Sequence, residues 1–254
     1  MNLSTMPFVN VAPYFHFLSA RWIGQHRVVS APPRQLGDLA RAGKVDAGVF
    51  SFVDGLELVA SGDFEWLGAM GIAGQGPISS ILLTGIGGLA SATELAGQPI
   101  AISPQTATTV RLLEIWLKQK VGVTDARFTS SEEKTKARLL IGDEALRWKI
   151  EQGPQQLHVD LSEAWTAWTG LPFVFARWAV RSSLSEREKK ELAMSLESAL
   201  DLGLGDLEHV AEEQAHRTGL SQAPIQAYLQ GIHYRLGPAE LAGAEEFKRR
   251  LDLL

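Results

Sequence analysis

Two apolar runs, about ninety residues apart, constrain this chain more than any other feature. In the segment Thr169–Val180, eight of twelve residues are apolar, and a Thr-Gly pair and a Leu-Pro pair precede the run. This pattern is typical of a strand that is buried on both faces and entered from a tight turn. The second run, Ser79–Thr84, is shorter and also largely apolar. We interpret the two runs as the paired connections between two lobes around a ligand cleft.

The composition narrows the class of protein. A chain of 254 residues that is 45% hydrophobic can bury a substantial core, in one large domain or in two lobes. The net charge of −5 argues against a nucleic-acid surface, and no apolar run approaches the roughly 18–20 residues of a membrane helix. The N-terminus lacks the pattern of a signal peptide. We expect a cytoplasmic protein without nucleic-acid or membrane partners, and its oligomeric state stays open.

Strand-like and helix-like segments alternate along the first two thirds of the chain, which predicts an α/β fold with parallel layers. Gly68–Gly76 is glycine-rich and leads into the apolar stretch Ile78–Leu83, and the chain after Val180, including Ala223–Tyr234, is helical in pattern. Capping boxes are expected at Ser91, Ser130 and Ser185. The predicted strands are Asn2–Phe8, Arg27–Ser30, Val45–Phe52, Ser79–Thr84, Pro99–Ser103, Arg138–Asp143 and Thr169–Val180, and the clearest early helices are Tyr14–Trp22 and Thr106–Lys120.

A discontinuous arrangement of two lobes fits this order. Residues 1–84 and 179–254 would form lobe one, and residues 85–178 would form lobe two. The alternative is a single doubly wound domain with a helical tail, and the pattern alone leaves both open.

Several kinds of chemistry lack their sequence signatures. The chain has no cysteine, and its six histidines form no metal-binding spacing. A nucleophile elbow, a Walker loop and a G-x-G-x-x-G motif are also absent. The sequence therefore predicts neither a metal nor a cofactor.

Small polar residues near the expected strand ends are the better candidates for a site. Asn10 follows the first strand, which would place its amide at the edge of a sheet where ligands bind in open α/β folds. The alternative is an Asx turn that caps the next helix. Ser79 and Ser80 begin a strand, and they could equally be ordinary turn hydroxyls.

A second group of candidates lies at expected helix starts. Thr106, Thr108 and Thr109 open a helix whose positive end could bind a carboxylate, although one of them could simply be the N-cap. Asp143, after Gly142, could contact a ligand hydroxyl or cap the following helix. These patterns predict a site for a small acid and leave the reaction open.

Short segments along nearly the whole chain carry a family resemblance. In the same order, they resemble the chorismate dehydratase family of the futalosine route of menaquinone biosynthesis, which begins with Tyr-Leu-Asn-x-x-Pro and later carries Gly-x-Val-x-Ser-Val-x-Leu. The segments are Pro7–Pro13, Val45–Ser51, Gly76–Leu83, Leu140–Leu146, Asp160–Trp165, Thr169–Val180, Tyr234–Gly237 and Leu241–Gly243.

This resemblance implies a fold and a reaction. The fold would be a two-lobed α/β fold of the type II periplasmic-binding-protein kind, with a ligand cleft between the lobes and used in the cytoplasm. The reaction would be loss of water from chorismate to give 3-[(1-carboxyvinyl)oxy]benzoate, a hydro-lyase step without a cofactor. Because the product ring is aromatic, the protein needs only to position the substrate and stabilise developing charge.

The resemblance also implies roles for single residues. Asn10 falls on the family asparagine that is thought to position the reacting ring, and a carboxylate of the substrate can serve as the base. Ser80 falls on the family serine, and Thr106–Thr109 falls on the family's Ser-Arg-Thr-Ser helix start. We therefore expect Asn10 and Ser80 to be catalytic, and the substrate to be bound by Ser79, Thr106, Thr108, Thr109, Gly142, Asp143, Thr169 and Gly170.

Two departures from the family pattern concern charge. Ala107 stands where the family usually has arginine, and Ser79 stands where lysine is common. Chorismate is a dianion, so the loss of these cations would weaken its binding or change the substrate. Arg111, Arg138 or Arg177 could compensate.

Two other functions are compatible with this fold. One is the related 1,4-dihydroxy-6-naphthoate synthase, whose Thr-Pro-Tyr-Thr-Thr helix start and mid-chain histidine have no clear counterpart here. The other is a non-catalytic binding protein, or sensor lobe, for a small carboxylate or aromatic ligand. The expected signal peptide or helix-turn-helix of such proteins is not visible in the sequence.

Overall fold

The chain divides into two compact units. The structure is a computed structural model that describes residues 1–18, 26–86, 89–131, 135–151 and 158–254. The first unit comprises Met1–Ile72 and Phe175–Leu236, and the second comprises Ala73–Val174 and Gly237–Leu254. Each unit has its own sheet.

The sheet of the first unit has the strand order β11-β4-β10-β3-β1-β2. Strand β1 runs parallel to β2 and β3, whereas β10 runs antiparallel to β3. Every residue of β3 is buried, as expected for a strand covered on both faces. The strands are β1 (Asn2–Thr5), β2 (Arg27–Ser30), β3 (Ala47–Ser51), β4 (Phe64–Gly74), β10 (Phe173–Arg181) and β11 (Ile232–Arg235).

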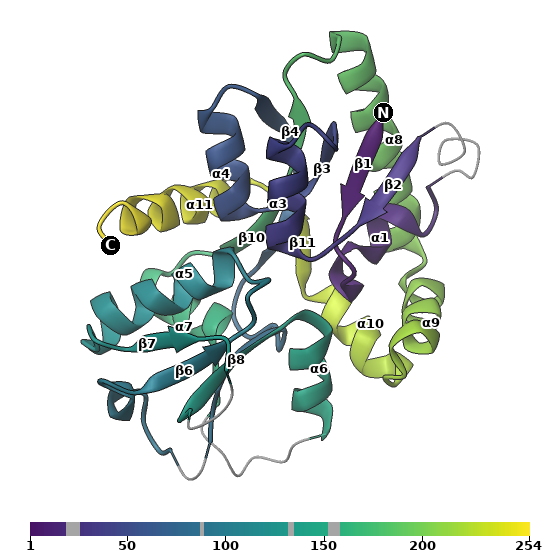
Figure 1. The fold of residues 1–254 in the computed structure, drawn as a ribbon. Coiled ribbons are helices and arrows are strands. Elements are labelled where there is room, and N and C mark those ends of the chain that lie inside the picture. Colours follow the sequence, from purple (N-terminus) through teal and green to yellow (C-terminus); the bar gives the residue numbers. More distant parts are fainter. Residues whose placement is uncertain (19–25, 87–88, 132–134, 152–157) are drawn as a thin grey trace. The chain divides into compact units, whose positions relative to one another are not determined.

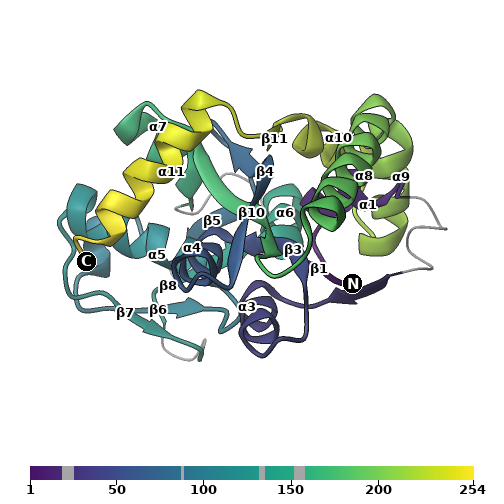
Figure 2. The same ribbon diagram turned by 90° about the horizontal axis from the view of Figure 1, so that it is seen from above.

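Two groups of helices accompany this sheet (Figures 1 and 2). Helices α3 and α4 lie side by side next to β3, and α8 and α9 pack against α1. The helical elements of this unit are η1 (Val9–Val11), α1 (Ala12–Phe15), α3 (Pro33–Arg41), α4 (Phe52–Ala60), α8 (Glu186–Gly205), α9 (Leu207–Thr218) and α10 (Gln222–Gln230).

A buried tyrosine fixes the segment that follows β1. The Tyr14 hydroxyl group accepts a hydrogen bond from Gly71 N at 3.1 Å and lies 2.9 Å from both Gly71 O and Tyr234 O. Burial raises the pKa of Tyr14, so the hydroxyl group stays protonated and can donate. On the same segment, Pro13 O lies 2.3 Å from where a Cβ atom on Gly203 would stand. Only glycine allows α8 to approach α1 this closely.

The sheet of the second unit has the order β7-β6-β8-β5-β9. Strands β6, β7 and β8 run parallel, and β5 runs antiparallel to β8 and β9. The carboxyl ends of four strands and the amino end of β5 therefore lie along one edge. The strands are β5 (Ile81–Gly85), β6 (Pro99–Ile102), β7 (Arg127–Thr129), β8 (Ala137–Ile141) and β9 (His158–Asp160).

Aromatic packing ties the helices of the second unit together. Trp165 and Phe173 are fully buried and contact Phe247, with ring centroids 5.1 Å apart for Phe173 and Phe247. Elsewhere Trp148 packs on Leu82 and on its buried neighbours. The helical elements are η2 (Ala92–Leu95), α5 (Thr108–Ile115), the π-helical η3 (Trp116–Val121), α6 (Gly142–Glu151), α7 (Leu161–Thr169) and α11 (Pro238–Leu251).

Several local predictions are confirmed and one is wrong. The strand Arg27–Ser30 and the capping boxes at Ser91 and Ser185 are present as expected. The glycine-rich segment Gly68–Gly76 is mostly strand β4, in which a Cβ atom on Gly71 would meet Ala176 O at 2.7 Å. A glycine-rich segment can thus be a strand where another strand's backbone comes close.

The wrong prediction is the helix over Ala223–Tyr234, because α10 ends at Gln230 and β11 follows. The first strand is also shorter than predicted and ends at Thr5. Part of the predicted helix Tyr14–Trp22 and part of the capping box at Ser130 lie outside the described residues.

The boundaries of the two units differ from the expected lobes 1–84 with 179–254 and 85–178. The chain passes between the units after Ile72, after Val174 and after Leu236. The return after Val174 falls within the predicted connection Thr169–Val180. The other predicted connection, Ser79–Thr84, is wrong, because β5 pairs with β8 and β9 inside the second unit. Helix α11 also belongs to the second unit, where Phe247 enters the aromatic cluster.

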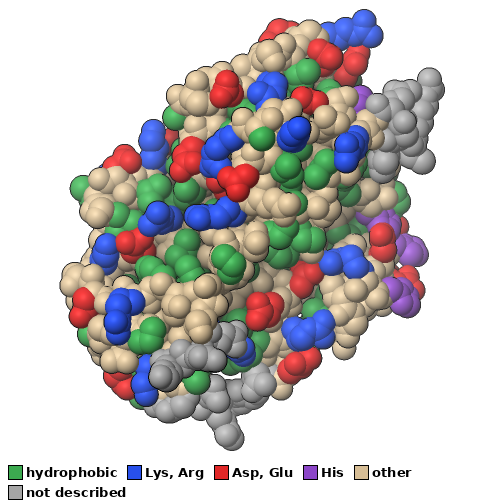
Figure 3. Space-filling view, in the orientation of Figure 1, with side chains coloured by type: hydrophobic (Ala, Val, Ile, Leu, Met, Phe, Trp, Pro, Cys, Tyr) green, Lys and Arg blue, Asp and Glu red, His purple; other side chains and the backbone are tan. Residues whose placement is uncertain are grey.

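The outer surface carries mixed charge. On the face drawn in Figure 3, Lys and Arg side chains lie among Asp and Glu side chains. None of the helices in the described ranges is long and apolar enough to cross a membrane.

Candidate functional site

One edge of the second sheet gathers several of the predicted site residues. Ile81 lies opposite Ile141, and Gly142 N donates a hydrogen bond to Ser80 O at 2.8 Å. Strand β6 runs beside β8 with Ile102 opposite Leu139, so the loop that leads to α5 starts at the same edge. Carboxyl edges of this kind are where open α/β sheets bind ligands.

Three buried residues in this region have hydroxyl groups without a described protein partner. Ser80, Thr106 and Thr109 are 4%, 3% and 9% exposed, and their hydroxyl groups form no hydrogen bond with any residue that the structure describes. Thr108 is buried as well. A hydroxyl group without a protein partner can hydrogen-bond to a ligand or to solvent.

None of the threonines caps α5. The N-cap position is Ala107, which offers no side-chain hydrogen bond to the first turn. The N-cap alternative for Thr106, Thr108 and Thr109 is therefore not observed. The N–H groups in the first turn of α5 therefore have no side-chain acceptor at the N-cap, and the positive end of the helix dipole is not compensated there.

The loop before β5 is held by Asp160, which is not among the predicted site residues. Asp160 Oδ2 accepts hydrogen bonds from Ile78 N at 2.9 Å and Ser79 N at 2.6 Å. Its Oδ1 atom accepts from Ser162 N and Glu163 N and so caps α7. Burial raises the pKa of the Asp160 carboxyl group, and the four N–H donors act against that shift. The Asp-x-x-Glu spacing is a recognisable helix start that could have revealed the cap.

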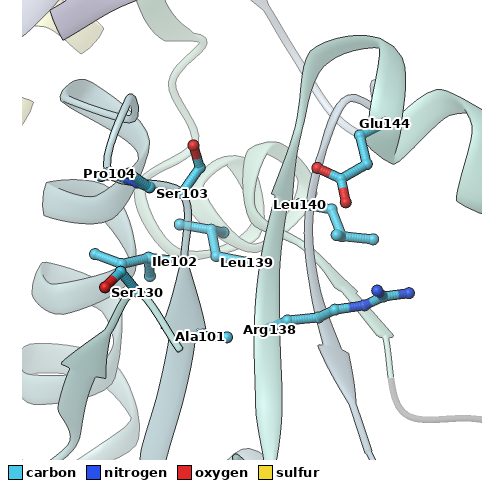
Figure 4. Close-up of a pocket in the computed structure, with 9 residues that line it drawn as sticks. All are labelled: Ala101, Ile102, Ser103, Pro104, Ser130, Arg138, Leu139, Leu140 and Glu144. Carbon is cyan, nitrogen blue, oxygen red and sulfur yellow. The ribbon is translucent and has the colours of Figure 1, made fainter. Parts of the chain in front are cut away.

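A pocket of about 130 Å³ opens beside strands β6 and β8 (Figure 4). Arg138 is half-buried in its wall and forms no ion pair within the described part of the chain. Glu144 is exposed, and Ser103 Oγ accepts a hydrogen bond from Gln105 N at 3.2 Å. In the close-up, Arg138, Leu140 and Glu144 lie on one side, and Ser103, Pro104 and Ser130 lie on the other.

The two other candidate arginines are engaged elsewhere. Arg111 pairs with Glu114 at 2.8 Å. Arg177 belongs to the first unit, where its guanidinium group lies 4.4 Å from the Trp66 ring centroid and donates to Gly68 O. Of the three, Arg138 is the one that lines the pocket.

Asn10 belongs to the first unit. It lies in η1, shortly after the carboxyl end of β1, and its Oδ1 atom is buried without a hydrogen-bond donor among the described residues. Neither η1 nor α1 has a side-chain cap, so the Asx-turn alternative is not observed. The nearby Tyr14 contacts keep this segment in place.

The remaining predicted residues have local contacts. Thr169 Oγ1 donates to Trp165 O at 2.9 Å and accepts from Leu171 N, and Gly170, at a φ of 73°, ends α7. Asp143 lies in the first turn of α6, directly after Gly142. Binding roles for Thr169, Gly170, Gly142 and Asp143 stay predictions. No group of three His, Cys, Asp or Glu side chains in the described ranges could hold a metal ion.

Comparison with known proteins identifies the family. The profile of the family described as menaquinone biosynthesis matches residues 1–252. The chain belongs to the menaquinone-biosynthesis family. A relative of this family member is the chorismate dehydratase of Thermus thermophilus, which is 31% identical over 271 aligned positions. The alignment covers 97% of this chain and 93% of the relative.

Solved structures show the fold of this family member. A protein of Archaeoglobus fulgidus matches with a TM-score of 0.80 at 16% identity, over 99% of this chain and 96% of that one. The periplasmic aliphatic sulphonate binding protein SsuA of Escherichia coli matches with a TM-score of 0.70 at 16% identity, over 100% and 85%. The expected periplasmic-binding-protein-like fold is thus confirmed.

Proposed function

We propose that this chain is a chorismate dehydratase, a carbon–oxygen lyase of the futalosine route of menaquinone biosynthesis. The observation that carries the proposal is the full-length relationship to the Thermus thermophilus enzyme, at 31% identity over 97% of the chain. The family match over residues 1–252 supports the same pathway. A cytoplasmic location stays a prediction.

The reaction makes modest demands on the protein. The C3–H bond and the C4–O bond of chorismate break, water leaves, and the ring becomes aromatic in 3-[(1-carboxyvinyl)oxy]benzoate. A carboxylate of the substrate can take the proton, so the protein needs no dedicated base. Its task is to orient the substrate and to stabilise the charge that develops as the hydroxyl group leaves.

The unpartnered polar groups suit this task. The hydroxyl groups of Ser80, Thr106 and Thr109 can hydrogen-bond to a carboxylate or hydroxyl group of the substrate. Asn10 offers a buried amide oxygen without a protein donor, and we assign it the positioning of the reacting ring.

We also assign one of the missing positive charges to Arg138. With Ala107 at the usual arginine position, a carboxylate of the dianionic substrate needs another cation. Arg138 lines a pocket with Ser103 and has no acidic partner among the described residues. A guanidinium group binds a carboxylate through two parallel hydrogen bonds.

The proposal is tested by incubating the purified protein with chorismate and following the aromatic product by absorbance and mass. We expect one product and one water for each chorismate consumed. Asn10→Ala should lower kcat by about a hundredfold, because misplaced reactants lose orientation. Its thermal midpoint should stay close to that of the wild type.

Arg187→Gln is the matched control, since Arg187 is an exposed residue of the first unit that pairs only with Glu191 at 2.8 Å among the described residues. Absence of product at high enzyme concentration rejects the dehydratase assignment. Product formation at the wild-type rate by Asn10→Ala removes Asn10 from the site.

A further inference from the structure

The residue before Ser80 has an unusual backbone conformation. Ser79 has a φ of 62°, and among the described residues it is the one non-glycine residue with a positive φ. This left-handed conformation is less stable for a residue with a side chain than for glycine. Such a conformation persists where the surrounding structure enforces it, often at a functional site.

Three hydrogen-bonding contacts hold this loop in the second unit. Asp160 Oδ2 accepts from Ile78 N and Ser79 N, at 2.9 and 2.6 Å. Gly142 N donates to Ser80 O at 2.8 Å. The loop is also bound farther upstream, where Gly76 N donates to the Thr166 hydroxyl group at 2.9 Å. Asp160 is the acidic residue among these partners. Its hydrogen bond from Ser79 N acts directly on the residue with the strained backbone.

The same carboxylate also caps a helix. Asp160 is 7% exposed, and its Oδ1 atom accepts hydrogen bonds from Ser162 N and Glu163 N at the start of α7. All the donors are backbone N–H groups, and they lie up to 82 residues away along the chain. One buried side chain thus fixes the helix start and the conformation of Ser79 together.

We propose that Asp160 is a positioning residue that holds Ser79 in its left-handed conformation and thereby aims the Ser80 hydroxyl group at the substrate. The inference rests on the proposed dehydratase function. Asp160 acts through the backbone of Ser79 and touches no reacting atom. Asp160 thus belongs to the supporting shell of the site, where its role is to preorganise Ser80.

The test starts with Asp160→Asn. The substituted amide presents acceptor character on only one side, so it cannot serve both pairs of N–H donors. We expect kcat for chorismate to fall about tenfold or more, because small misplacements of reacting groups are costly. Ser185→Ala, which removes the N-cap of α8 in the first unit, is the control for a general loss of stability. It should lower the thermal midpoint and leave kcat unchanged.

A second substitution separates positioning from helix capping. Glycine adopts a positive φ without strain, so Ser79→Gly should make the loop conformation less dependent on Asp160. We expect Asp160→Asn to lower kcat several-fold less in the Ser79→Gly background than in the wild-type background. A residue that only caps α7 would cause the same loss in both.

The outcomes are distinct. Turnover by the wild type with unchanged kcat in Asp160→Asn, or with an equal loss in both backgrounds, overturns this inference and leaves the proposed function standing. No turnover by the wild type rejects the proposed function, and this inference falls with it. A large loss that Ser79→Gly reduces supports both.

Discussion

Arg138 and Glu144 place opposite charges in the wall of one pocket. If Arg138 binds a carboxylate of chorismate, Arg138→Gln should raise KM about tenfold or more, because charged hydrogen bonds contribute roughly 1.5–3 kcal/mol. Glu144→Gln should lower KM, since it removes a negative charge near the bound anion. The change for Glu144 should be smaller, because its exposed carboxylate is screened by solvent.

Steady-state kinetics with chorismate check both directions. The matched control is Arg111→Gln, which removes the same charge from an arginine that pairs with Glu114 outside the pocket lining. Equal KM values for the Arg111 and Arg138 variants would contradict a specific role for Arg138. A rise in KM for Glu144→Gln would contradict the assigned sign of the pocket charge.

At the scale of elements, Arg250 fastens α11 to its neighbours, and Glu246 pairs with arginines of the same helix. Arg250 lies 3.6 Å from the Trp168 ring centroid in α7, and Gln119 of η3 donates to Arg250 O at 3.0 Å. Glu246 accepts from Arg249 and Arg250 at 2.8 and 2.7 Å. The Arg249 guanidinium group, followed by the charge of Arg250, lowers the pKa of Glu246 to about 2.

This shift predicts a pH dependence of stability. Because the folded-state pKa lies below the ordinary value of 4.5, the stabilisation is fully present above pH 4.5 and is lost as the pH falls through about 2. Glu246→Gln should therefore lower the free energy of unfolding at pH 7 by about 1 kcal/mol, the upper end for partly exposed ion pairs. The difference from the wild type should shrink towards pH 2 in urea titrations. A difference that is constant from pH 7 to pH 2 would exclude the ion pairs as its cause.

On the scale of the whole molecule, the chain passes three times between the units. Because Phe247 packs with Trp165 and Phe173, the C-terminal helix stabilises the second unit. Phe247→Ala should cost about 3–5 kcal/mol, the usual effect of emptying a buried aromatic site.

Hydrogen exchange measured segment by segment can locate this loss. Protection should fall in β5 and β8 of the second unit and change little in β3 of the first unit. Ser185→Ala should show the reverse distribution, because α8 belongs to the first unit. Equal loss of protection in all three strands after Phe247→Ala would show that the units unfold as one.

The sequence by itself determined the α/β class, the capping boxes at Ser91 and Ser185 and the family. These features depend on short patterns whose signals lie within a few residues of each other. It also marked the polar groups at the strand ends, among them Asn10 and Ser80. The return connection after Val174 lies within a long apolar run, and such a run must be buried in the fold.

Only the tertiary structure decided which segments share a unit and which groups support the site. Strand β5 pairs with β8 and β9 in the second sheet. The apolar residues of β5 predict a buried strand, but they do not indicate which strands it pairs with. The glycines of β4 resemble a loop locally, although Gly71 is needed where Ala176 O comes close. In the same way, Asp160 reaches Ser79 across 81 residues of chain. Hydrogen bonds between distant segments depend on how the sheets assemble, and no local pattern encodes them.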